Sequence, residues 1–234
     1  MPLTLYYVWE SKKVLRAGRL LQRVGKWEPS CRLENFAPMA DRKWEILSSE
    51  YVLESPWYRL RRDACRLPDG SVVESYYVRE HAGFSVTFAV TPANHVVFTR
   101  QYKHGIGDFV LELPAGMLES GEDPLTCARR ELEEETGYVA REFTPVAEFA
   151  TDPTSSTGHL HLFVALGAVP EGTPSPEITE NIDTTLVPLD RVLEQVRLRR
   201  VRAQSQVASI YAALDSLDLL HSSAKTEPTQ SRSV

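Results

Sequence analysis

Three glutamates that lie close together are the side chains of this sequence best suited to chemistry. Glu131, Glu134 and Glu135 are spaced i, i+3 and i+4, so they share one face if the segment is helical. Each like-charge pair on a helix costs about 0.2–0.5 kcal/mol, and the negative end of the helix dipole adds a few tenths. A divalent cation would turn this repulsion into coordination, and clustered oxygen ligands suit Mg²⁺ or Mn²⁺ rather than zinc. The alternative is an acidic helix end that faces water.

The residues on either side predict where this helix begins and ends. Asp123 is a good N-cap and Pro124 suits the first helical position, while Gly137 is a typical C-terminal stop. These positions predict a helix over 124–136. Its apolar stripe toward the core would consist of Leu125, Ala128 and Leu132.

The whole segment from Gly116 to Tyr138 has the spacing Gly-x5-Glu-x7-Arg-Glu-Leu-x-Glu-Glu-x-Gly. This pattern resembles the signature of the Nudix hydrolase family. The matching positions are Gly116, Glu122, Arg130, Glu131, Leu132, Glu134, Glu135 and Gly137. Tyr138 stands where the family usually has an aliphatic residue.

The resemblance implies a role for each residue of the segment. Glu131 and Glu135 resemble the main metal ligands, and Glu134 resembles a further ligand or the residue that holds a water molecule. The carbonyl of Ala115 resembles a backbone ligand. The resemblance implies Mg²⁺ as the cofactor, with Mn²⁺ as the alternative. Arg130 and Glu122 resemble a pair that fixes the loop before the helix by a charge-assisted hydrogen bond.

A second set of residues resembles the ADP-ribose pyrophosphatase branch of the family. Pro153 lies 16 residues after Gly137, where that branch has a proline, although a loop proline is by default a turn former. The runs 100–104 and 111–116 are similar to the same branch. The branch's usual glycine after this proline is absent from residues 152–156, so the exact sugar stays open.

The resemblance also implies a catalytic base and groups that bind substrate. The base is expected on an acidic loop before the last strand, with Glu180 as first choice and Glu177 or Glu134 as the alternatives. Arg100 and Lys103 are candidates for holding phosphate or the terminal ribose, and Glu112 for binding substrate or water. Each of these could instead be an ordinary solvated charge.

Together these features predict metal-dependent hydrolysis of the pyrophosphate bond of a small nucleoside diphosphate derivative. ADP-ribose, cut to AMP and ribose 5-phosphate, is the leading substrate. The alternatives are another nucleotide sugar such as GDP-mannose, a non-catalytic nucleotide-binding regulator with the same fold, or a membrane-associated protein that uses basic residues within 1–27.

The remaining elements are expected to position this segment in an α/β (α+β) fold, a Nudix α/β/α sandwich with a mixed sheet, spanning residues 84–218. Strands are predicted at 86–91, 95–101, 109–113, 143–149, 159–166 and 183–188, and further helices at 189–196 and 203–217. A small antiparallel sheet is predicted in 41–83, with strands at 43–53, 57–66 and 72–79. The resemblance implies that this sheet helps to build a homodimer.

Composition sets the outer limits. A net charge of −6 excludes an overall basic nucleic-acid footprint, and no apolar run approaches the ~20 residues that a membrane span needs. Three cysteines without metal or disulfide spacing favour a reducing cytoplasm. Residues 1–40 are predicted to be a disordered extension or to precede a true start at Met39, and residues 219–234 a disordered tail.

Overall fold

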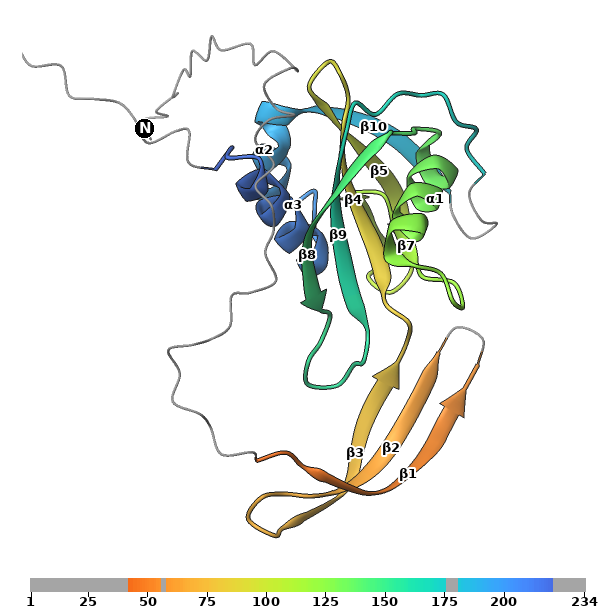
Figure 1. Cartoon of the computed structure of the whole chain (residues 1–234), viewed down its shortest axis with the longest axis vertical. Helices are drawn as coiled ribbons and strands as arrows, with labels where there is room; N and C mark the ends of the chain where they lie inside the picture. The colour runs from red at the N-terminus through yellow and green to blue at the C-terminus, as the bar shows by residue number, and fades with distance from the viewer. Residues whose placement is uncertain (1–41, 56–57, 176–180, 221–234) are drawn as a thin grey trace, which may run out of the picture.

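The computed structural model describes residues 42–55, 58–175 and 181–220 of the 234-residue chain. Within them the chain forms a small sheet and a larger sheet that carries helices on both faces (Figure 1). The candidate bases Glu177 and Glu180, the expected extension 1–40 and residues 221–234 of the expected tail lie outside the described residues.

The small sheet is antiparallel, as predicted. Its strands, in the order β1-β2-β3, are β1 (Glu45–Glu54), β2 (Arg59–Arg66) and β3 (Val72–Glu80). Gly70 has a φ of 86° in the turn between β2 and β3, a conformation in which a side chain would be strained. Trp44 packs edge-on against Tyr76 with the ring centroids 5.2 Å apart, so these two aromatics stabilise the sheet's end.

The larger sheet is mixed and has seven strands within the described residues. They are β4 (Phe84–Val90), β5 (His95–Lys103), β6 (Asp108–Glu112), β7 (Ala115–Met117), β8 (Glu142–Ala150), β9 (His159–Leu166) and β10 (Ile182–Pro188). The order is β10-β5-β4-β9-β8, with β6 paired to β5 and β7 paired to β4. The pair β4 and β9 is parallel, and the other pairs are antiparallel.

Helices cover both faces of this sheet and make a three-layer sandwich (Figure 1). The helix α1 (Pro124–Thr136) lies on one face, while α2 (Val192–Arg197) and α3 (Gln204–Ser216) lie on the other. Val97 packs with Leu132 of α1, whereas its neighbour Phe98 packs with Ile210 of α3. Alternate side chains of β5 therefore enter different layers, which decides where its charged residues lie.

Two local expectations needed correction. The short strand β7 was not predicted, because its three residues have little strand propensity and its ladder is formed with the distant strand β4. The apolar stripe of α1 also differs: Leu125 is only half-buried, and Cys127 is fully buried beside Ala128 and Leu132.

The small sheet is joined to the larger one through the strand β3 and the loop 151–158 (Figure 1). The backbone N–H of Arg79 donates to Ser155 O at 2.8 Å, and the N–H of Thr157 donates to Arg79 O at 3.1 Å. The hydroxyl of Tyr76 donates to Thr154 O, and the ring of His81 lies 3.0 Å from Ser156 Oγ. Polar contacts thus make up this junction, rather than an apolar core.

Candidate functional site

The helix that carries the glutamates is fixed at both ends. Asp123 Oδ1 accepts hydrogen bonds from the backbone N–H groups of Leu125 and Thr126 at 3.0 and 3.2 Å. Gly137 ends the helix in the left-handed region, with a φ of 70°, and its N–H donates to Glu133 O at 2.7 Å. These caps confirm the predicted limits and set which side of α1 faces the sheet.

The acidic face of α1 points into the protein rather than into water. Glu131 and Glu135 are only 8% and 3% exposed, while the side chain of Glu134 is 39% exposed. Burying carboxylates costs free energy unless hydrogen-bond partners or cations compensate. The solvated helix end that the sequence left open is therefore excluded.

The short strand β7 runs directly against these carboxylates. Ala115 N–H donates to Glu135 Oε2 at 3.0 Å. A Cβ on Gly116 would stand 1.9 Å from the carboxyl group of Glu131, so only glycine allows this approach. The strand that sequence analysis missed is thus the element that lines the acidic face of the helix.

Arg130 joins the loop 118–122 to the helix. Its Nε and Nη2 donate to the two carboxylate oxygens of Glu122, each at 2.9 Å, and Nη2 also donates to Met117 O at 3.1 Å. Glu122 in turn accepts from the N–H of Glu119 at 3.0 Å. The Arg130–Glu122 pair that the sequence suggested is present with two-point geometry.

The other edge of Arg130 reaches into the acidic cluster. Its Nη1 donates to Glu131 Oε1 at 2.7 Å and to Glu134 Oε2 at 3.1 Å. The hydrogen bonds that the guanidinium donates to Glu122, and then to Glu131, raise its pKa still further above its ordinary range. The same pairing lowers the pKa of Glu122. One guanidinium therefore supplies positive charge to three carboxylates.

The chemistry of these donors fits a hard divalent cation. Glu131 and Glu135 lie buried beside β7, the partly exposed Glu134 shares their helix face, and Mg²⁺ and Mn²⁺ prefer oxygen ligands. With Arg130 Nη1 between Glu131 and Glu134, no group of three His, Cys, Asp or Glu side chains in the described ranges is placed to hold a metal.

Cys127 lies beneath this site and was not singled out by sequence. Its Sγ donates to Gly116 O at 3.4 Å, and burial raises the pKa of the thiol to about 11. A thiol that stays protonated at neutral pH is a poor nucleophile and a poor metal ligand. Its contact with β7 is therefore structural.

The candidate substrate residues separate between the two faces of the sheet. Lys103 Nζ lies 2.9 Å from Glu112 Oε2, and Glu112 is 9% exposed. Arg100 stands an odd number of residues from Lys103 on the same strand, and it pairs with Leu111, which packs in the core under α3. Within one copy of the chain, Arg100 thus lies on the face opposite α1.

The last candidate, Pro153, and two neighbouring histidines take up ordinary local roles. Pro153 is exposed in a turn held by Asp152, whose Oδ1 accepts from the N–H of Thr154 at 3.2 Å. His159 and His161 each approach Glu148 at 3.9 Å and have no other metal-ligating group arranged with them in the described part of the chain. None of the helices in the described ranges is long and apolar enough to cross a membrane.

Comparison with known proteins gives consistent matches. The NUDIX domain family matches residues 80–207, and the nucleoside diphosphate sugar hydrolase N-terminal domain matches residues 44–78. The methanol dehydrogenase activator of Bacillus methanolicus is 32% identical over 167 residues, which cover 71% of this chain and 90% of that protein. The ADP-ribose pyrophosphatase of Bacillus subtilis is 31% identical over 159 residues, which cover 67% of this chain and 85% of that protein.

The fold has a solved counterpart as well. A crystal structure of ADP compounds hydrolase superposes with a TM-score of 0.69 at 20% identity, covering 78% of this chain and 98% of that one. The fold, the buried acidic face of α1 and the match over more than half of the chain agree. The chain therefore belongs to the NUDIX family and is a Nudix pyrophosphohydrolase.

Proposed function

We propose that this enzyme hydrolyses ADP-ribose to AMP and ribose 5-phosphate with the help of Mg²⁺ or Mn²⁺. The observation that carries the proposal is the pair of buried carboxylates, Glu131 and Glu135, which lie against β7 on one face of α1. The similarity to an ADP-ribose pyrophosphatase over most of that protein's length supports the substrate.

The residues divide into those that hold a cation and those that hold the site in place. Glu131, Glu135, Glu134 and the carbonyl of Ala115 would hold the metal. When bound, a divalent cation neutralises the diphosphate and lowers the pKa of a coordinated water. Glu122 and Arg130 keep the loop before α1 in position, so the acidic face is organised before substrate arrives.

The substrate would be bound and cleaved by side chains around this cluster. Lys103 supplies a positive charge on the α1 face for a phosphate, and Glu112 holds that lysine in place. Pro153 would shape the loop beside the sugar. Glu180 would take a proton from the attacking water as general base. The new bond joins water oxygen to one phosphorus, and the bond from that phosphorus to the bridging oxygen breaks.

A substrate panel tests the proposal. Purified protein is mixed with ADP-ribose, GDP-mannose, NADH, diadenosine polyphosphates or coenzyme A, and the nucleotide products are measured by chromatography with Mg²⁺, with Mn²⁺ and with chelator. We expect the highest kcat/KM for ADP-ribose and no turnover with chelator. A higher kcat/KM for GDP-mannose would replace the substrate, and turnover in chelator would overturn the metal assignment.

One substitution tests the ligand assignment directly. Glu131→Gln removes a negative charge from the buried cluster while keeping its size, so we expect kcat to fall by about 10³-fold or more with little loss of thermal stability. Glu133→Gln, on the exposed side of the same helix, is the matched control and should keep the activity of the parent protein. Near-full turnover in Glu131→Gln would contradict the proposed role.

We also propose that the active form is a homodimer built through the small sheet. All ten residues of β1 are exposed in a single chain, including Ile46 and Leu53. A two-sided exposed strand with large apolar side chains is unfavourable in water, and a three-stranded sheet needs a surface to pack on. A second copy of the chain is the partner that the family resemblance supports.

A further inference from the structure

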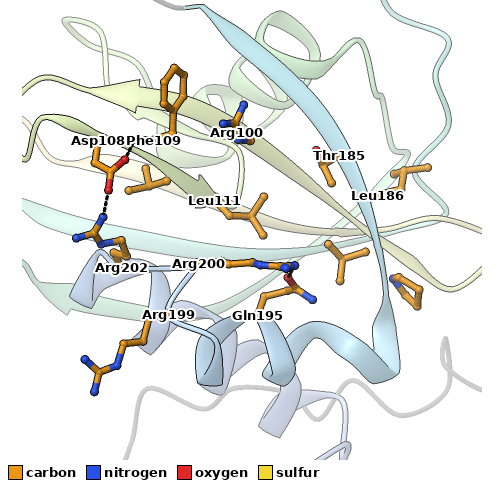
Figure 2. A pocket seen from close by; sticks show the side chains of 13 residues that line it. Arg100, Asp108, Phe109, Leu111, Thr185, Leu186, Gln195, Arg199, Arg200 and Arg202 are labelled. Carbon is orange, nitrogen blue, oxygen red and sulfur yellow. Dashed lines mark hydrogen bonds and ion pairs between the residues drawn. The ribbon is translucent and has the colours of Figure 1, made fainter.

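A groove with arginines on its walls lies on the face of the sheet opposite the glutamates. It has a volume of about 600 Å³ and runs between the strands β5, β6 and β10 and the segment after α2 (Figure 2). Its charged lining residues are Arg100, Asp108, Arg199, Arg200 and Arg202. We call it the arginine groove.

The wall formed by residues 199–202 is held rigidly against the sheet. Leu111 N–H donates to Arg200 O at 3.0 Å, which ties this segment to β6. Arg199 adopts the left-handed backbone region with a φ of 56°, a conformation that is uncommon for a residue with a side chain. Figure 2 shows that the side chain of Arg199 extends away from the sheet, so it belongs to the rim.

Two of the arginines are ion-paired, and a third is not. Arg202 Nη1 pairs with Asp108, and Arg100 Nη1 approaches Asp183 Oδ2 at 3.4 Å. Arg200 Nη1 donates to the neutral Gln195 Oε1 at 2.9 Å, and within the described ranges no carboxylate forms an ion pair with it. An additional anion would therefore have a positively charged donor ready to bind it.

The charge of the groove is opposite to that of the whole molecule. Three arginines and one aspartate line its interior, a balance of +2, with Arg199 at the rim, while the chain as a whole has a net charge of −6. A local excess of guanidinium groups inside a concave surface concentrates anions there. This excess lies on a face that the carboxylate site does not use.

The groove also has an apolar surface suited to a ring. Phe109 is exposed, and the guanidinium of Arg100 lies 4.5 Å from its ring centroid. Leu111 lies next to it on β6. A volume of this size falls within the usual range of about 300–1,000 Å³ for small-molecule sites. Aromatic surface beside arginines is a suitable setting for a planar base that carries a phosphate.

We infer that the arginine groove binds an organic phosphate of the nucleoside monophosphate class, separately from the hydrolytic site. Arg200 and Arg202 contact the phosphate, and the base lies along Phe109 and Arg100. Arg100 thereby acquires a role on the face where the structure places it. The inference does not depend on the identity of the hydrolysed substrate.

Calorimetry with AMP in chelator and low salt tests this inference on the full chain. AMP should bind, orthophosphate should bind more weakly, and adenosine, which lacks the phosphate, should not bind. The double substitution Arg200→Gln and Arg202→Gln should weaken AMP binding by about tenfold or more, because two charge-assisted contacts are lost. Arg197→Gln, an equal charge loss on an exposed position of α2 outside the groove, should change the affinity less than about twofold.

Three further measurements keep the result decisive. If the double variant melts at a much lower temperature, Arg200→Gln alone decides the matter, because Arg200 donates to the neutral Gln195 and no ion pair within the described ranges is broken. AMP binding that is kept in Glu131→Gln separates the groove from the hydrolytic site. The inference is overturned if AMP does not bind, or if Arg197→Gln weakens binding as much as Arg200→Gln does.

Discussion

Arg130 uses its two edges for different purposes. One edge makes a two-point contact with Glu122, and the other reaches Glu131 and Glu134. The first contact is a planar fork that lysine cannot reproduce, whereas the second depends mainly on charge. The chemical identity of this side chain therefore matters for the position of the loop, and its charge matters for the acidic cluster.

This division predicts the effect of a substitution that keeps the charge. Arg130→Lys should lower kcat by about 10- to 100-fold, because the loop before α1 loses its two-point contact. Turnover of the best substrate at saturating Mg²⁺ gives the measurement. Arg129→Lys is the matched control, since Arg129 is exposed and bonds to Ala140 O and Arg141 O on the outer side of the helix. Equal kcat in the two variants would refute this role.

Gly116 predicts a second effect at the level of one residue. Its added Cβ would collide with the carboxyl group of Glu131, so Gly116→Ala should displace that carboxylate and lower kcat by about 100-fold or more. The melting temperature should change little, because the displaced carboxylate belongs to the site rather than to the apolar core. Gly105→Ala meets no atom within 4 Å and should keep parental activity. Parental kcat in Gly116→Ala would count against this reading.

The sequence predicted the placement of the acidic residues better than the placement of the candidate substrate residues. The spacing of Glu131, Glu134 and Glu135 on a helix specifies one face, and that face can be read from local geometry alone. The strand alternation of β5 already implies that Arg100 and Lys103 point to opposite faces, because an odd number of residues separates them. Which face lies under α1 is decided by pairing with distant strands, and this could not be read from the sequence.

At the scale of elements, the junction between β3 and the loop 151–158 depends on His81. Gly83 N–H donates to His81 Nδ1 at 3.2 Å, so the other ring nitrogen carries the hydrogen and donates to Ser156 Oγ. Burial, followed by the charges of Arg79 and His159, lowers the pKa of His81. The folded junction thus favours a neutral ring.

This lowered pKa predicts how stability changes with pH. Below the ordinary histidine pKa of about 6.5, the unfolded chain takes up a proton more readily than the folded one, so stability falls as pH decreases. His81→Gln should give a shallower fall in melting temperature between pH 7.5 and about 5.5, measured by circular dichroism. His104→Gln, at an exposed position away from the junction, should retain the parental slope. An unchanged slope in His81→Gln would disprove this account.

Helices and strands that are specified by nearby residues were predicted more accurately than those that depend on distant pairing. The helix α1 was predicted to the residue, because Asp123, Pro124 and Gly137 act within the segment. The strand β9 was also predicted with its observed limits, since its apolar run is continuous. The strand β7 was missed because it is short and pairs with β4, about 30 positions away in sequence.

At the scale of the molecule, the small sheet is the part that a single chain leaves most exposed. Its outer strand β1 is held by hydrogen bonds to β2 and by polar contacts such as Arg66 with Glu45 at 2.6 Å. Exposed ion pairs of this kind contribute little. The sequence predicted this sheet from strand and turn signals, but it contains no local signal that shows what packs on it.

The proposed homodimer predicts a change in mass. Ile46→Glu together with Leu53→Glu should shift the protein from dimer to monomer in light scattering after size-exclusion chromatography, because buried charges oppose association. Leu198→Glu, an exposed apolar position just after α2, is the matched control and should leave the mass unchanged. A parental protein that elutes as a monomer at all concentrations would rule out the dimer.

A strand with no buried residue has a consequence for how the protein behaves on dilution. Within one chain the backbone amides of β1 are protected only on the side that pairs with β2, so the exchange of the others reports on whatever covers the outer edge. Under mass action, exchange in β1 should slow as protein concentration rises, while exchange in the core strand β4 should stay constant. The two sheets of one chain would then respond to concentration independently.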